Sequence, residues 1–472
     1  MSTILTHEAE TKIELKSFTY DKLQISWRHS KRHNKLYVKS VIGEYFFLVP
    51  SDWELKNWSL HYRRLAEVLI FQQFWDSKDF AAFIANKWTP DSVAVAAAAA
   101  GKVEVGVAVQ VTTDDKNNDR NNDRNNDRNN DKTKDKKDKD VDESSPNMNN
   151  DNNGVVAISF SGGLDSCAIV PLLEPGFFMA YLKRVIPMTT MMRHKQQLLA
   201  LDYIHDNYEC SSFIMETDIE LISLKITGRV GFPSEYACCL PCIILADHVG
   251  ITSICTGTIG LFIKGVKYHE FNKTTYFKFW KDLFQKANLE LFWPVGGVVD
   301  RGTALICERT GIPGQSCIRN DNGFCNRCFK CFRKNILILN KTQDGSKSQD
   351  LSLNNKNYRN SSRSRSRNSS RERVLRIPPE AKHKLIKKPL TLIELYQKGV
   401  IKDYNLDKFK FLDLSYQSHY MKECYDYLVP QRLKKNICQR LDALLGEMND
   451  KQINTVKKLD LSSLNDVKIN LE

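Results

Sequence analysis

The chain has 472 residues and a formal net charge of +13, and its length predicts two or three domains rather than one small core. Its 42% hydrophobic and 26% charged residues are typical of soluble proteins, and no apolar run approaches the roughly 20 residues that a membrane-spanning helix needs. Because the opening residues lack the apolar block of a secretory signal and the thirteen cysteines are clustered, we expect a cytoplasmic protein with no membrane partner, whose thiols are reduced or bind metal.

The first block, residues 1–95, predicts a small α+β unit. Helical spacing of apolar residues predicts a helix from about Leu60 to Phe83. Short apolar runs predict the strands Leu23–Trp27, Leu36–Val41 and Tyr45–Val49.

Two segments of biased composition predict disorder. Residues 96–153 form a spacer in which Asp114–Asp140 carries nine acidic and nine basic residues and no apolar residue. Residues 341–375 form a Ser/Arg/Asn-rich linker. Ten of the 13 net positive charges lie between Lys356 and Lys388, where there are 12 Lys/Arg and two Glu. We interpret the linker as a solvated connection, with an RNA-binding arm as the alternative.

The middle block, residues 154–340, alternates short apolar strands with amphipathic helices, which predicts an α/β fold with a parallel sheet and helices on both faces. The predicted strands are Val155–Phe160, Phe177–Leu182, Ser212–Glu216 and Ser253–Thr256. The predicted helices are Thr190–Asn207, Glu235–Val249 and Gly302–Thr310.

A glycine-rich loop follows the first of these strands and precedes an apolar segment that predicts a helix. Its two glycines let the backbone approach a ligand closely, and a helix start offers free N–H groups to an anion. Asp165 is suited to holding Mg²⁺ or to orienting the loop, and there is no Gly-Lys-Ser/Thr of a Walker loop. The residues expected to bind phosphate are Ser159, Ser161, Gly162, Gly163, Leu164, Asp165 and Ser166.

The segment Ser161–Ser166 resembles the Ser-Gly-Gly-x-Asp-Ser loop of the N-type ATP pyrophosphatases, the PP-loop superfamily with an adenine nucleotide α-hydrolase-like fold. The resemblance implies that ATP is cleaved between its α and β phosphates and that AMP is placed on a substrate oxygen. It also implies that Asp165 and Ser166 are catalytic and that Asp165 holds magnesium. Thr256 and Gly257 follow a later strand at its carboxyl end, where open α/β sheets bind ligands, and we expect them to complete the ATP site.

Four cysteines near the end of the middle block have the spacing of a zinc site. Cys317, Cys325, Cys328 and Cys331 read C-x7-C-x2-C-x2-C, and four thiolates on short spacers suit tetrahedral zinc. With the glycine loop, they resemble the 7-cyano-7-deazaguanine synthase group across Val155–Lys334. This resemblance implies an ATP-dependent ligase in which ammonia or another nitrogen donor attacks an adenylated small-molecule acceptor. Elements that would identify the acceptor, an Asp-Tyr after Thr258 among them, are absent from the sequence, so the acceptor stays open.

A second cysteine group, Cys238, Cys239 and Cys242, supplies the main alternative. Its C-x2-C resembles that of the tRNA 2-thiocytidine synthetase group, which implies a [4Fe–4S] cluster held by Cys239, Cys242 and a later cysteine, and tRNA as substrate. The same cysteines also suit a buried apolar role. A third hypothesis is a binding module that keeps the fold without catalysis.

The last block, residues 376–472, predicts helices. Leu433, Ile437, Leu441 and Leu444 recur at helical spacing after Pro430. We interpret this block as a packing surface, because no cluster of reactive side chains stands out in it.

Overall fold

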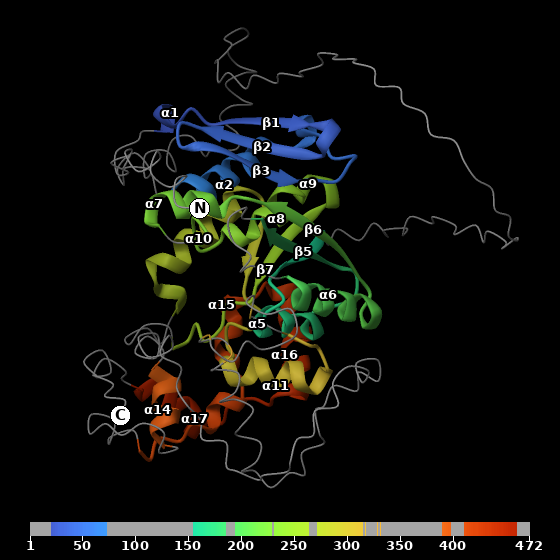
Figure 1. Ribbon diagram of the computed structural model, residues 1–472. Coiled ribbons are helices and arrows are strands. Elements are labelled where there is room, and N and C mark those ends of the chain that lie inside the picture. Colours follow the sequence, from blue (N-terminus) through green and yellow to red (C-terminus); the bar gives the residue numbers. More distant parts are fainter. Residues whose placement is uncertain are drawn as a thin grey trace, which may run out of the picture.

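The structure is a computed structural model that describes residues 20–72, 154–185, 194–228, 231–263, 271–314, 317, 328, 331, 389–397 and 410–459. Its centre is an eight-stranded sheet in the order β1-β2-β3-β6-β5-β4-β7-β8 (Figure 1). The strands are β1 (Ser26–Ser30), β2 (Lys35–Ser40), β3 (Gly43–Leu48), β4 (Val155–Phe160), β5 (Phe177–Arg184), β6 (Cys210–Thr217), β7 (Ile251–Thr256) and β8 (Glu290–Phe292). The predicted spacer and linker, residues 96–153 and 341–375, lie outside the described residues.

Five of the strands form the parallel part of the sheet. β4 pairs with β5 and β7, β5 pairs with β6, and β7 pairs with β8, all in parallel. The bounds of β4 agree with the prediction, because an apolar run such as Val155–Phe160 suits a central strand that is covered on both faces. In space the five strands stand in the chain order third, second, first, fourth, fifth. The order therefore reverses between β4 and β7, and this reversal is the switch point of a doubly wound sheet.

The N-terminal strands extend this sheet in antiparallel fashion. β1, β2 and β3 form a meander, and β3 pairs with β6 at Phe47 and Thr217. Two side-chain bonds reinforce the junction: the Thr217 hydroxyl donates to the carbonyl of Phe46 at 2.6 Å, and the Phe46 amide donates to Asp218 at 2.8 Å. The three strands of residues 1–95 thus join the sheet of the middle block. The first was predicted at Leu23–Trp27, but Leu23 ends the helical turn α1 and the strand runs from Ser26 to Ser30.

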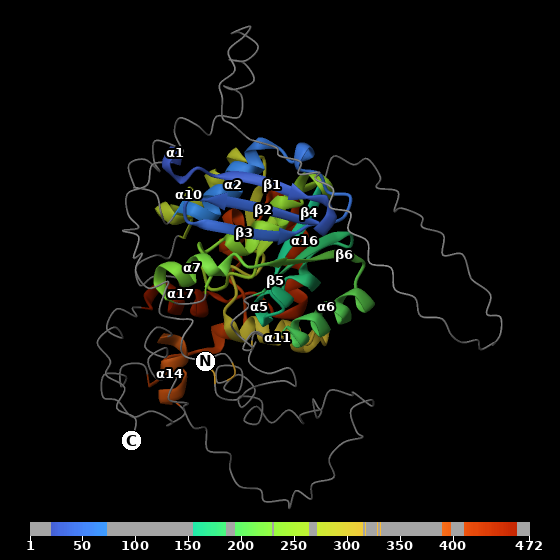
Figure 2. The ribbon, with the colours of Figure 1, turned by 45° about the horizontal axis from the view of Figure 1, so that its top comes forward.

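The helices cover the sheet on two sides. Figure 2 shows α2 and α10 on one side of the strands and α6 and α11 on the other. α8 packs on β4, β5 and β7, and α2 packs on α8. The helices of at least eight residues are α2 (Leu60–Phe71), α6 (Lys195–Asn207), α7 (Glu220–Thr227), α10 (Thr275–Lys286), α11 (Asp300–Thr310), α14 (Pro389–Gln397), α16 (Gln431–Leu444) and α17 (Asp450–Lys458). Shorter helical turns include α1 (Tyr20–Leu23), α5 (Leu164–Cys167), α8 (Leu240–Ile244), α9 (Ala246–Val249) and α15 (Tyr425–Leu428).

Two predicted helices differ from the structure. The helix expected at Glu235–Val249 is divided into a 3-10 turn, α8 and α9, with Leu245 outside the helical region between them. The helix expected after the glycine loop is only the four-residue α5 and a separate 3-10 turn at Val170–Leu172. Pro171 accounts for the second difference, because it lacks an N–H and disfavours helical geometry at the residue before it.

The C-terminal helices pack on the end of the middle block. The amide of Trp293 donates to the carbonyl of Leu428, and the Tyr425 hydroxyl donates to the carbonyl of Pro294 at 2.8 Å. Gly297 makes this packing possible, since a Cβ there would lie 2.5 Å from the Tyr425 ring. The helix predicted after Pro430 is confirmed as α16, with Ile437 and Leu441 buried. Among the described helices, none is both long and apolar enough to cross a membrane.

Candidate functional site

The glycine loop leaves β4 through a tight, internally bonded turn. Gly162 has φ +67°, a left-handed conformation that glycine adopts without cost. The Ser166 hydroxyl donates to the carbonyl of Gly163 at 3.1 Å and accepts from the amide of Ser161 at 3.2 Å. Ser166 is buried and Ser161 is exposed, but both hydroxyls shape the loop, because Ser161 Oγ lies 3.0 Å from Ser166 Oγ and accepts from the amide of Gly163 at 3.4 Å. Because α5 has only one turn, the expected contribution of a long helix dipole to anion binding is small.

The loop after β7 lies directly against the glycine loop. Ser159 and Thr256 are register partners on β4 and β7, which places the two following loops side by side. A Cβ on Gly257 would lie 2.7 Å from the amide nitrogen of Ser166 and 2.8 Å from the carbonyl carbon of Asp165. Only glycine permits this approach. The structure therefore brings Gly257 together with Ser161–Ser166 at the switch point.

Asp165 is joined to α11. The Thr303 hydroxyl donates to Asp165 Oδ1 at 2.8 Å, and the Cys307 thiol donates to the carbonyl of Leu164 at 3.3 Å. Both α11 residues are buried. The carboxylate of Asp165 is half-buried and offers the hard oxygen ligands that Mg²⁺ takes, but one of its observed functions is to connect the loop to α11.

Two predicted phosphate ligands use their hydroxyls elsewhere. Ser159 is buried and donates to the carbonyl of Cys238 at 2.8 Å, and Thr256 is buried and pairs with the Thr258 hydroxyl at 3.1 Å. These bonds hold the loop ends together. Both residues thus help to hold the loops, and their assignment as phosphate-binding residues stays a prediction.

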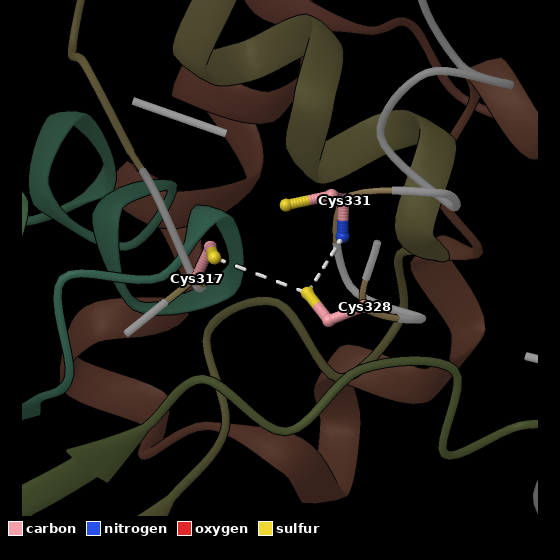
Figure 3. A group of neighbouring side chains, drawn as sticks. All are labelled: Cys317, Cys328 and Cys331. Carbon is pink, nitrogen blue, oxygen red and sulfur yellow. Dashed lines mark hydrogen bonds between the residues drawn. The ribbon is translucent and has the colours of Figure 1, made fainter. Parts of the chain in front are cut away.

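Three of the four predicted zinc ligands converge in the structure. Cys317, Cys328 and Cys331 are buried, and their sulfur atoms all lie within 4.8 Å of one another (Figure 3). The sulfurs of Cys317 and Cys328 are 3.9 Å apart, close to the about 3.8 Å expected for two thiolates at Zn–S bonds of about 2.3 Å in a tetrahedron. The Cys331 amide also donates to the Cys328 sulfur at 3.5 Å. The cluster can bind a metal ion, and Cys325, the predicted fourth ligand, lies outside the described residues.

The second cysteine group has a different environment. Cys239 and Cys242 are fully buried, and burial raises the pKa of both thiols. A hydrogen bond from Cys239 lowers the pKa of Cys238. Within the described part of the chain, only Cys317, Cys328 and Cys331 gather as a set of three potential ligands. The environment of Cys239 and Cys242 favours an apolar packing role.

Three residues near the loop have no signal in the sequence. Gln197 of α6 is buried beside Gly162, where a Cβ would lie 2.6 Å from both Cβ and Cγ of Gln197. Thr303 and Gly314 contact the loop from α11 and from the segment after it. Each of these contacts joins segments that are far apart in the chain, which local sequence patterns do not predict. The end of α11 at Gly311 does have a local signal, the glycine itself.

These observations define the class of protein: an α/β protein whose mostly parallel sheet has a glycine loop at its switch point and a buried cysteine cluster nearby. Residues 279–460 match the model of a family of unknown function, DUF6395. The match covers less than half of the chain and runs from α10 through the cysteine cluster to α17. No curated protein matches the chain.

Proposed function

We propose that Ser161–Ser166 binds the phosphates of ATP and that the protein transfers AMP to an oxygen of a small-molecule acceptor. One observation carries this proposal: the loops after β4 and β7 meet at the switch point, where Gly162 and Gly257 keep side chains out of the way. Doubly wound sheets bind nucleotides at this position. The resemblance of the loop to the PP-loop superfamily supports ATP as the nucleotide.

The proposed reaction is the one that the resemblance to the PP-loop superfamily implies. A carboxylate or carbonyl oxygen of the acceptor bonds to the α-phosphorus, while the bond from that phosphorus to the bridging oxygen breaks and its electrons leave with pyrophosphate. The loop amides stabilise the departing phosphates. A nitrogen donor such as ammonia then displaces AMP from the acceptor carbon. Asp165 and Ser166 order the loop, and Mg²⁺ held at Asp165 would supply charge neutralisation on the phosphates.

The cysteine cluster fits zinc as a stabilising ion. Three buried thiols within 4.8 Å of one another, two of them with sulfurs 3.9 Å apart, form a soft donor set that suits zinc. We assign Cys317, Cys328 and Cys331 to this ion, with Cys325 as the proposed fourth ligand.

Exchange of labelled pyrophosphate into ATP tests the proposal, with 7-deazapurine carboxylates and bulk tRNA as acceptors. We expect exchange with one acceptor and its loss in Asp165→Ala, while Asp202→Asn, an exposed change on α6, keeps it. Wild-type exchange in Asp165→Ala would refute the assigned role of Asp165. ATP binding without exchange would favour the hypothesis of a binding module without catalysis. Exchange with tRNA as the only active acceptor, in protein that contains iron, would favour the thiolation alternative.

A further inference from the structure

The cysteine cluster and the glycine loop share a supporting residue, Gln197. Its Nε2 donates to the carbonyl of Cys317 at 3.3 Å, while its own Cα, Cβ and Cγ lie within 2.9 Å of the position that a Cβ on Gly162 would take. Gln197 is 1% exposed and sits in the first turn of α6. One buried side chain thus contacts a potential metal ligand, Cys317, at one end and the left-handed glycine of the loop at the other.

A second contact joins the same two regions independently of Gln197. Gly314 lies three residues before Cys317, and a Cβ there would be 3.1 Å from Cα of Leu164 and 3.2 Å from Cβ of Cys167. The segment that leads to the cluster therefore packs on α5, directly after the loop. Figure 3 shows Cys317 beside the teal turns that follow β4.

A bound metal would restrain this arrangement. An ion shared by Cys317, Cys328 and Cys331 links residues that are 11 and 14 positions apart in the chain, and so fixes the backbone of Cys317 against the loop. Without the ion, the 3.9 Å contact between the sulfurs of Cys317 and Cys328 restrains Cys317 less than shared metal bonds would, and the carbonyl that Gln197 reaches can shift more easily. The support under Gly162 then loosens.

From this geometry we infer that metal occupancy of the cysteine cluster controls the affinity of the glycine loop for phosphate, and that Gln197 transmits the effect. This inference rests on the proposed function for its ligand, ATP. Because coupling between two binding sites is reciprocal, ATP raises the affinity for zinc by the same factor. We expect a factor of about ten, within the usual range of such couplings.

The experiment closes a thermodynamic cycle on the full chain. ATP affinity is measured by calorimetry for zinc-loaded and chelated protein in excess magnesium, and zinc affinity is measured with and without ATP at free zinc fixed by a chelator buffer. We expect about tenfold tighter ATP binding with zinc, and the same factor for zinc with ATP. Equal ATP affinity in both forms overturns the inference while leaving the proposed function standing.

A variant separates Gln197 from the metal itself. Gln197→Met keeps an unbranched side chain under Gly162 but removes the donor to Cys317, so it should retain zinc and lose most of the coupling. The matched control is Leu199→Met on the same helix, whose side chain is 44% exposed. If chelated wild-type protein fails to fold, zinc-loaded Gln197→Met still decides the question. ATP affinity equal to that of wild-type protein in this variant would overturn the inference.

Hydrogen exchange supplies a readout that needs no nucleotide. The amides of 161–166 should exchange faster in chelated protein and in Gln197→Met than in zinc-loaded wild-type protein. If no form binds ATP but these amides respond to zinc, the proposed function fails and the structural link stands. If ATP binds and the amides ignore zinc, the link fails and the proposed function stands.

Discussion

The two ends of the sheet are built by different means. In the antiparallel end, large aromatic side chains fill the core. Trp27 packs edge-on against Trp58 with 4.9 Å between the ring centroids, and the centroids of Trp58 and Trp53 are 5.9 Å apart. In the parallel part, glycines let backbone segments meet, as Gly162 does with Gln197 and Gly257 with Ser166. The first arrangement gains stability from buried area. The second gains close packing of the segments that meet at the switch point.

This difference predicts separate effects of mutation. Changes in the aromatic cluster should lower stability and leave ligand binding intact, because its contacts with the parallel part run through α8. The Trp53 and Trp58 indoles donate to the carbonyls of Ile244 and Ile243 at 3.0 and 3.2 Å. Changes near the switch point should alter ligand binding out of proportion to stability.

The largest expected effect is the loss of metal from the cysteine cluster. Cys328→Ser should reduce bound zinc from about one ion per chain to near zero, because a neutral hydroxyl is a poor substitute for a thiolate ligand. Metal analysis of the purified protein measures it. The control is Cys242→Ser, the same replacement in the other C-x2-C, which should keep its zinc while burying a hydroxyl at a cost of about 1–3 kcal/mol. Equal zinc loss in both would show that the two groups are not distinct.

The two C-x2-C motifs also show what the sequence could predict. Their spacing is the same, yet Cys328 and Cys331 converge whereas Cys239 lies just before α8 and Cys242 within it, among apolar residues. Apolar Ile243 and Ile244 after Cys242 were the sequence signal for burial. Spacing identifies candidate ligands, but the surrounding packing decides whether they face one another.

The same limit holds for the fold. β4, the glycine loop and the end of α11 at Gly311 follow from local signals, and the structure has them where they were predicted. The pairing of β3 with β6 joins residues about 170 positions apart and has no local signal. The helix α10 was missed, although Thr274 caps it by accepting from the amide of Phe277. Long-range contacts such as that of Gln197 with Gly162 needed the structure.

The next effect tests the aromatic end. Trp58→Ala should destabilise the protein by about 3–5 kcal/mol, because it removes a large buried side chain and leaves a cavity between Trp27 and Trp53. Urea unfolding measures this change, and ATP affinity at a temperature where the variant is folded should stay within about twofold of wild type. Trp58→Phe keeps a ring but loses the hydrogen bond to the carbonyl of Ile243, so it should destabilise the protein by only about 1 kcal/mol. A large loss of ATP affinity in Trp58→Ala would break the proposed separation.

Two glycines with the same backbone conformation test the switch point. Gly162 and Gly228 have φ +67° and +66°, but a Cβ on Gly228 meets nothing within 4 Å. Gly228→Ala should therefore cost only the left-handed strain of about 1–2 kcal/mol. Gly162→Ala should cost about 1–3 kcal/mol more, because Gln197 must move. Calorimetry should also show weaker ATP binding in Gly162→Ala alone, and equal behaviour of the two variants would contradict the close packing.

The smallest expected effect is a pH dependence at the aromatic end. Glu67 of α2 is buried, accepts from the Trp27 indole at 3.0 Å and pairs with Arg64 at 2.9 Å, and burial raises its pKa above the ordinary value of 4.5. Because the pKa of Glu67 is higher in the folded than in the unfolded protein, its protonated form favours folding. This contribution is complete below the pKa of the unfolded state and is lost as the pH rises through the pKa of the folded state. Each unit of pKa shift corresponds to about 1.4 kcal/mol. The free energy of unfolding of Glu67→Gln should therefore increase relative to that of wild-type protein as the pH rises from about 4 to about 8. Urea unfolding at each pH measures this difference.

Asp413 supplies a control of opposite sign. The amide of Ser415 donates to its carboxylate at 2.8 Å and holds its pKa below the ordinary value of 3.8. Its contribution to stability is present above that value and is lost as pH falls through the folded pKa. The stability difference between Asp413→Asn and wild-type protein should therefore disappear in acid. The stability difference between Glu67→Gln and wild-type protein should instead grow towards neutral pH. ATP affinity should follow neither trend, because both carboxylates lie outside the contacts of the glycine loop. If ATP affinity followed the titration of Glu67, the antiparallel end of the sheet would be part of the ligand site.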